Sequence, residues 1–250
     1  MRYFVKLAYN GTPFFGWQIQ PDQISVQAVL ENAFSLLLRS EIKLTGCGRT
    51  DTGVHAREFY AHFDFPELLP DENIRHLIFR LNSFLPKEIV IYRILAMHGT
   101  AHARFDATAR TYRYYIDTEK DPFRFCFSYR VYDSLNIEIM NEAAQILIPY
   151  RDFKSFSKVR TQVNNFNCRI AAASWYVENR QLVFEITADR FLRNMVRAIV
   201  GTHLEIGKGR MSLTEFKEAI EAGNRSRAGI SVPAHALFLE KIRYPDSFGL

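Results

Sequence analysis

The sequence predicts an α+β protein made of two ferredoxin-like halves, each with the element order βαββαβ and a mostly antiparallel sheet, the two sheets being combined around a central cleft. Apolar and polar residues alternate where strands are expected, and apolar residues recur at helical spacing where helices are expected. Nearly the same order of elements occurs twice along the chain. We expect the first half to span residues 1–106 and the second residues 107–250, with the boundary near residues 104–109.

In the first half, alternation predicts strands over residues 2–10, 42–47, 58–65 and 88–97. Between the first two, the segment "SVQAVLENAFSLLLR" (25–39) repeats apolar residues every three or four positions and predicts a helix. A second helix is predicted over residues 71–84 and ends before Pro86, which cannot continue it. A glycine-rich loop therefore separates the second and third strands.

The second half shows nearly the same order. Strands are predicted over residues 110–118, 168–178, 181–188 and 236–242. One helix is predicted over 137–148, and another begins near Arg190. A further helix opens at Ser212 with a capping box to Glu215 and ends at Gly223.

Composition favours an ordinary globular protein of the cytoplasm. Of 250 residues, 48% are hydrophobic and 24% are charged, and no run of eighteen apolar residues could cross a membrane. The opening "MRYFVKLAYNG" alternates and does not resemble a signal-peptide core. Three cysteines without a CxxC pair indicate a reduced protein with no structural zinc.

The positive charge is concentrated in one part of the chain. The formal net charge is +5, and the stretch from Tyr150 to Arg197 alone holds nine basic residues against four acidic ones. A localised basic surface is what binding to a polyanion such as a nucleic acid requires.

The segment "GCGRTDTGVH" (46–55) carries the first candidate for chemistry. Arg49 precedes Asp51 by two residues, and a neighbouring arginine favours the ionised form of a carboxylate. An ionised and firmly held Asp51 could act as a nucleophile. The same residues are also ordinary turn formers, so a structural Arg–Asp pair in a loop is the alternative.

Basic and aromatic residues of the second half are candidates for RNA contacts. Arg190, Arg193 and Arg197 fall on one face of the helix expected there, opposite an apolar face. Tyr112, on the strand "RTYRYYI", is either a stacking platform for a base or a half-buried strand tyrosine. The segment "YRDFKSFSKVR" (150–160) mixes basic and aromatic residues, although Phe153 and Phe156 could simply be core. The basic candidates for contacts to RNA phosphates are Arg110, Lys154, Lys158, Arg160, Arg190 and Arg193.

Phosphate-cradling nucleotide motifs of the GxxxxGK and GxGxxG types are absent from the sequence. His55, His62 and Asp64 are a weak candidate for a metal site, and no deaminase zinc signature occurs. We therefore expect neither a metal nor another cofactor.

Seven blocks of the sequence, in order, resemble those of the tRNA pseudouridine synthases of the TruA type. They are "YNGTPFFGWQIQP" with "SVQAVLE", "GCGRTDTGVHA", "LNSFLP", "AHARFDATARTYRYYI", "DFKSF", "FLRNMVRAIVGT" and "PAHALFLEKI". The resemblance implies an isomerase that needs no cofactor, acts as a homodimer and modifies uridines 38, 39 and 40 of the tRNA anticodon stem-loop.

The resemblance also implies roles for single residues. Asp51 falls on the catalytic aspartate and Arg49 on the arginine beside it. Tyr112 falls on the tyrosine that packs on the target base, and Arg197 on a basic residue placed near the aspartate. The chain departs from the family at Arg151, where a histidine is usual, and at Ala236-Leu237, where Gly-Leu is common.

The implied reaction breaks the N1–C1′ bond of a uridine flipped out of its stack and joins C5 to C1′. Asp51 would attack C6 or C1′, or assist loss of the base to leave a glycal; the sequence leaves these routes open. Two other functions stay as alternatives. One is a non-catalytic RNA-binding module with the same fold, and the other is a metal-dependent nuclease using Asp51, Asp64 and His62.

Overall fold

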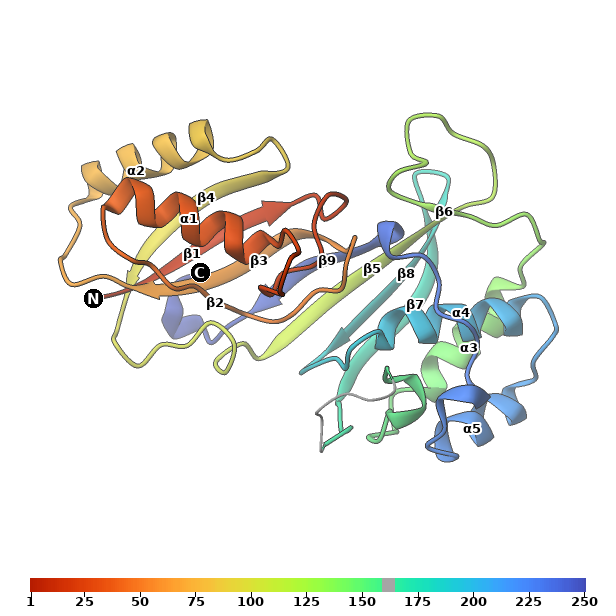
Figure 1. The fold of residues 1–250 in the computed structure, drawn as a ribbon. Helices are drawn as coiled ribbons and strands as arrows, with labels where there is room; N and C mark the ends of the chain where they lie inside the picture. The colour runs from red at the N-terminus through yellow and green to blue at the C-terminus, as the bar shows by residue number, and fades with distance from the viewer. Residues whose placement is uncertain (159–164) are drawn as a thin grey trace. The chain divides into compact units, whose positions relative to one another are not determined.

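Helices and mainly antiparallel strands alternate along the chain, which confirms the α+β class (Figure 1). The computed structural model describes residues 1–158 and 165–250. These residues form two units, one of residues 1–108 with 239–250 and one of residues 109–238. The last strand thus begins in the second unit and continues in the first.

The first unit contains β1 (Arg2–Tyr9), α1 (Val26–Leu38), β2 (Thr45–Gly46), β3 (His55–Asp64), α2 (Asp71–Phe84), β4 (Ile89–Met97) and most of β9 (Leu237–Arg243). β1 lies between β4 and β3 and is antiparallel to both, while β2 is antiparallel to β3. α1 contacts α2, and α2 packs on β4. Except for the shorter β2, these elements lie within a few residues of the bounds predicted from the sequence.

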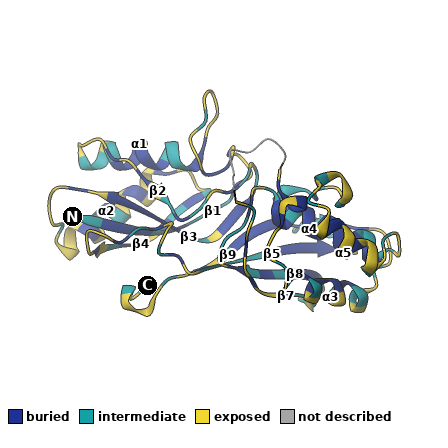
Figure 2. Ribbon diagram, turned by 90° about the horizontal axis from the view of Figure 1, so that it is seen from below, coloured by how far each residue is buried: buried dark blue, intermediate teal, exposed yellow. Residues whose placement is uncertain are grey.

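β3 is buried on both faces, because different parts of the unit cover each one (Figure 2). Phe63 points to the helices, with its ring centroid 5.1 Å from that of Phe34 on α1. Tyr60 lies on the opposite face, where Tyr244 from the C-terminal segment meets it edge-on at 5.2 Å. The C-terminal residues therefore serve as part of the first unit's core.

The second unit contains β5 (Ala109–Asp117), β6 (Tyr129–Arg130), α3 (Ile137–Ile146), β7 (Ile170–Glu178), β8 (Gln181–Ala188), α4 (Met195–Gly207) and α5 (Leu213–Glu221). β8 lies between β5 and β7 and is antiparallel to both, whereas β6 is parallel to β5. The capping box at the start of α5 is confirmed, since Ser212 and Glu215 exchange side-chain to backbone hydrogen bonds.

The prediction of a helix beginning near Arg190 is wrong. α4 begins at Met195, and its N-cap residue Asn194 has a φ of 69°, in the left-handed region that a continuing right-handed helix cannot include. The Asp189 side chain also accepts hydrogen bonds from the backbone N–H groups of Arg169 and Arg190, which fixes a loop there. Arg190 and Arg193 therefore do not share a helical face with Arg197.

His203 of α4 lies at the centre of the second unit's core and is fully buried. Its Nδ1 accepts a hydrogen bond of 3.0 Å from the Trp175 indole N–H, so the neutral ring carries its proton on Nε2. The rings of Phe184 and Phe216 stand edge-on to it, each at 5.3 Å. Burial in these apolar surroundings lowers the pKa of His203 to about 3.

We expect the free energy of unfolding to fall as the pH drops from 6.5 to 5, because unfolded His203 takes up a proton there and buried His203 does not. One such histidine contributes a slope of up to about 1.4 kcal/mol per pH unit. His62 adds to the effect, since burial lowers its pKa to about 4. Urea unfolding of wild type and His203→Gln at several pH values measures the slope. The variant should be less stable at pH 7 but flatter in its pH dependence, whereas the exposed control His76→Gln should keep the full slope; equal slopes in all three would contradict the assignment.

Candidate active site

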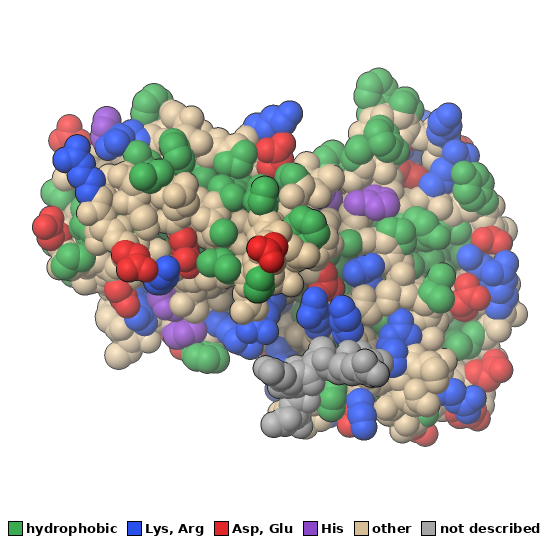
Figure 3. Space-filling view, in the orientation of Figure 1, with side chains coloured by type: hydrophobic (Ala, Val, Ile, Leu, Met, Phe, Trp, Pro, Cys, Tyr) green, Lys and Arg blue, Asp and Glu red, His purple; other side chains and the backbone are tan. Residues whose placement is uncertain are grey.

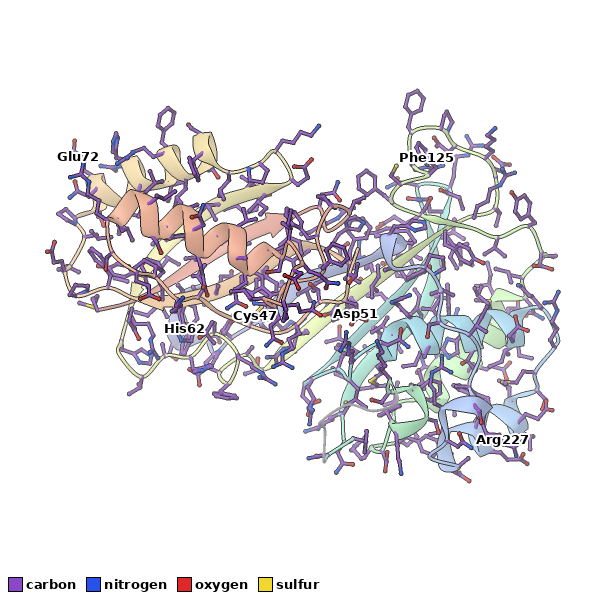
Figure 4. All side chains as sticks on the ribbon, viewed as in Figure 1. Cys47, Asp51, His62, Glu72, Phe125 and Arg227 are labelled. Atoms are coloured by element: carbon purple, nitrogen blue, oxygen red, sulfur yellow. The ribbon has the colours of Figure 1, made fainter. Side chains whose placement is uncertain are left out.

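Asp51 lies in the loop between β2 and β3 of the first unit, with a partly exposed side chain (Figure 4). The loop begins where the Cys47 N–H donates to the Tyr60 carbonyl at 2.7 Å and ends in a turn where the Val54 N–H donates to the Asp51 carbonyl at 3.1 Å. Gly53 within that turn has a φ of 76°, a conformation that favours glycine. Arg49, two residues before Asp51, is exposed.

A second segment, residues 12–25 with Gly11 before it, packs against the Asp51 loop. An added Cβ at Gly16 would lie 2.4 Å from the Thr50 carbonyl oxygen, and Gly16 has a φ of 83°. An added Cβ at Gly11 would lie 2.0 Å from the Val54 carbonyl oxygen. The two glycines thus allow this backbone to lie directly on the loop. Gly16 meets it at Thr50, just before Asp51, and Gly11 meets it at Val54, just after Asp51.

Hydrogen bonds complete the attachment of the loop. The Gly53 N–H donates to the Phe14 carbonyl at 3.3 Å, and the hydroxyls of Tyr9 and Thr50 are bonded at 2.9 Å in the buried interior. The Gly11 N–H donates to Nδ1 of His55 at 3.0 Å. Asp51 is therefore presented from a loop whose backbone is held by partners on β1, β3 and residues 11–17.

The block "YNGTPFFGWQIQP" has a structural role in this unit that its resemblance to a family motif did not predict. Trp17 from this block stacks on Phe59 of β3 at 4.1 Å between ring centroids, and an added Cβ on Gly46 would collide with the Trp17 ring at 2.5 Å. Two glycines five residues apart, flanked by aromatic residues, were the available signal of close backbone packing. Nothing in the local pattern specified the Asp51 loop as the partner.

Tyr112 and Arg197 belong to the second unit. Tyr112 is half-buried on β5, paired in register with Ile186, and Phe191 meets its ring edge-on at 5.1 Å. Nε of Arg197 on α4 donates to the Val232 carbonyl at 2.7 Å. Near Arg197, Tyr114 is fully buried and its hydroxyl donates to the Pro233 carbonyl, and this burial raises the pKa of Tyr114.

Contacts within the second unit connect most of the basic residues predicted to bind RNA. Arg110 donates to the Asp189 carbonyl at 2.6 Å, directly before Arg190. The Lys158 N–H donates to the Arg193 carbonyl at 3.1 Å, so these two residues are neighbours as well. Figure 3 shows Lys and Arg side chains gathered on the second unit over the region of β5, β8 and α4. Arg160 lies outside the described residues.

The aromatic residues of "YRDFKSFSKVR" have a different task. Phe153 and Phe156 are fully buried core residues, so they offer no surface on which a base could stack. Lys154 keeps its ammonium 5.9 Å from the Phe166 ring. Arg151 stands where the family that the sequence resembles usually has a histidine. It donates hydrogen bonds to the Ile148, Pro149 and Tyr150 carbonyls and so stabilises the turn after α3.

The side chains of the candidate metal site, His55, His62 and Asp64, are engaged in contacts within the protein. Both carboxylate oxygens of Asp64 accept hydrogen bonds from Arg2, at 2.9 and 2.7 Å, and Nδ1 of His62 accepts one from the Ala103 N–H. Among residues 1–158 and 165–250, no three His, Cys, Asp or Glu side chains are grouped so as to hold a metal ion. Over the same residues, every helix is too short or too polar to cross a membrane.

Comparison with known proteins gives consistent matches. Residues 143–245 match a family model described as tRNA pseudouridine synthase. The tRNA pseudouridine synthase A of Parabacteroides distasonis is 51% identical over 98% of this chain and 96% of its own length. The proteins of the same description from Porphyromonas gingivalis and Bacillus subtilis are 52% and 38% identical, over 100% and 98% of this chain and 99% and 100% of their own lengths.

Proposed function

The chain belongs to the tRNA pseudouridine synthase family, and we propose that it converts uridine to pseudouridine at positions 38, 39 and 40 of the tRNA anticodon stem-loop. The observation that carries the proposal is the partly exposed Asp51 carboxylate on a loop whose backbone is held on both sides by Gly11 and Gly16. A carboxylate in such a setting can reach a substrate without having to be ordered first.

The net chemistry is an isomerisation that consumes no other reactant. The N1–C1′ bond breaks, the uracil turns, a C5–C1′ bond forms, the C5 proton is lost and N1 gains a proton. Ionised Asp51 acts as the nucleophile on C6 or C1′, or assists departure of the base to leave a glycal. No step of this scheme needs a metal or another cofactor.

The target base must leave its stack before Asp51 can reach it. In this proposal the exposed Arg49 fills the space that the base leaves and forms an ion pair with Asp51. Tyr112 stacks on the detached uracil and so limits its escape, and its hydroxyl is a candidate for moving the C5 proton. Arg197 supplies positive charge to the same reaction.

RNA binding is assigned to the second half, residues 107–250, and the catalytic loop to residues 1–106. Arg110, Lys154, Lys158, Arg160, Arg190 and Arg193 contact phosphates of the anticodon stem-loop. The antiparallel pairing of β1 with β3 and β4, and of β2 with β3, supports a ferredoxin-like first half. We also propose that the second half is ferredoxin-like, that a cleft lies between the halves, and that the protein is a cytoplasmic homodimer.

Release of tritium from tRNA labelled at C5 of its uridines tests the function, because the C5 hydrogen is lost only when a new bond forms there. The wild-type protein should release tritium from a tRNA with uridines at 38, 39 and 40. It should release no tritium from a control tRNA that carries cytidines at these three positions. Addition of a chelator should leave the rate unchanged. Binding of tRNA without any release would favour the RNA-binding module, and chelator-sensitive cleavage of the RNA would favour the nuclease.

A further inference from the structure

Residues 12–25 of the first unit, called loop 12–25 below, present large apolar side chains to solvent. Phe15 is 42% exposed, Ile19 46% and Ile24 63%. All three lie in one short loop whose single charged residue is Asp22, and a backbone hydrogen bond from Phe15 to Ile24 places two of them side by side. Exposed apolar residues that lie together, unlike single scattered ones, mark surfaces that contact a partner.

The loop holds these side chains in a fixed frame. The Phe15 N–H donates to the Ile24 carbonyl at 2.9 Å, and the Gln20 side-chain amide donates to the Phe15 carbonyl at 2.9 Å. Gln20 and Gln23 form an isolated β-bridge, and Asp22 between them has a φ of 58° in the tight turn. Because the backbone is closed on itself, the apolar surface is ready before any partner arrives.

The same loop is attached to the Asp51 loop. Phe15 stands between Phe14, whose carbonyl accepts the Gly53 N–H, and Gly16, whose Cα lies against the backbone of Thr50 and Asp51. An RNA that brings a uridine to Asp51 therefore brings the neighbouring nucleotides to loop 12–25. When the target base leaves its stack, the base beside it exposes a flat apolar face.

We propose that loop 12–25 is an RNA-contact surface of this enzyme, in which Phe15 stacks on the base next to the flipped uridine and Ile19 and Ile24 pack on the adjoining nucleotide. The exposed amides of Gln18 and Gln23 hydrogen-bond the edges of these bases. The inference rests on the proposed function, and it extends the substrate site from the second unit's basic residues to a mainly apolar surface on the first unit.

The variant Phe15→Ala tests the proposal, with Phe15→Trp as the conservative replacement. Loss of one stacked base lowers affinity by about 5- to 150-fold, so Phe15→Ala should weaken binding of an anticodon stem-loop RNA and raise KM for tRNA by an amount in that range. Phe15→Trp should restore both quantities. The slope of log affinity against log salt should equal that of the wild type, because no phosphate contact has been removed.

Phe79 on α2 offers a matched control, since it is also an exposed phenylalanine of the first unit, 70% exposed. Phe79→Ala should bind and turn over tRNA like the wild type. If Phe15→Ala destabilises the protein in a thermal melt, Ile24→Ser replaces it as the test variant. Wild-type affinity and KM in Phe15→Ala would overturn the proposal while wild-type tritium release leaves the function standing. Absence of release by the wild type would instead overturn the function itself.

Discussion

Replacement of Asp51 by asparagine should abolish turnover and leave tRNA binding intact. Asparagine has nearly the same shape, so the loop held by Gly11 and Gly16 should keep its conformation. An amide, however, is neither charged at neutral pH nor an effective nucleophile, and removal of the attacking group typically costs about 10⁴-fold or more in kcat. Single-turnover tritium release from C5-labelled tRNA measures the rate, and filter binding with the same tRNA measures the affinity.

Asp64→Asn is the matched control for this experiment. Asp64 is exposed in large part and pairs with Arg2, and such a surface pair contributes about 1 kcal/mol or less to stability. We expect this variant to turn over at the wild-type rate. A nuclease that used Asp51 and Asp64 together would lose activity in both variants. Turnover by Asp51→Asn at the wild-type rate would remove Asp51 from the proposed mechanism.

The sequence predicts most of the secondary structure because hydrophobic periodicity reports burial directly. The helix α2 and the strand β4 appear as predicted, since each has one apolar face that packs within its unit. The prediction fails at Arg190 and Arg193, where arginines at helical spacing precede a helix instead of lying on it. The left-handed conformation of Asn194 decides that outcome, and it follows from contacts such as the bond from its side-chain amide to Ser231, 37 residues away.

The candidate site shows the same division between local and distant causes. Asp51 is recognisable from a short motif, because its neighbours Arg49 and Gly53 lie beside it in the sequence. The segment that packs on its loop through Gly11, Phe14 and Gly16 lies some 35 to 40 positions earlier and carries no reactive group. A glycine at position 16 indicates that a side chain does not fit there. Only the fold shows that the Thr50 carbonyl occupies the position that a side chain would take.

Gly16→Ala and Gly11→Ala should therefore impair catalysis although neither glycine has a side chain that could take part in the reaction. At Gly16 the new methyl group meets the Thr50 carbonyl at 2.4 Å and the residue must keep a φ of 83°, so the segment and the Asp51 loop have to move apart. Overpacking of this kind costs about 1–3 kcal/mol, and the left-handed conformation adds about 1–2 kcal/mol for a residue with a side chain. At Gly11 the contact with the Val54 carbonyl is closer still, 2.0 Å. A displacement of about 1 Å can reduce turnover by about 10²-fold.

Gly99→Ala separates this effect from the general cost of removing a glycine. Gly99 lies in the same unit, and an added Cβ there would meet nothing within 4 Å. Thermal melts should show a lower midpoint for Gly16→Ala and Gly11→Ala and an unchanged midpoint for Gly99→Ala. Tritium release should fall in the same two variants. Affinity for tRNA should fall less than kcat, because only the proposed contacts of loop 12–25 are disturbed and the basic residues assigned to phosphate binding lie in the second unit. If Gly16→Ala keeps both the wild-type melting midpoint and the wild-type kcat, the close approach of residues 12–25 is not what positions Asp51.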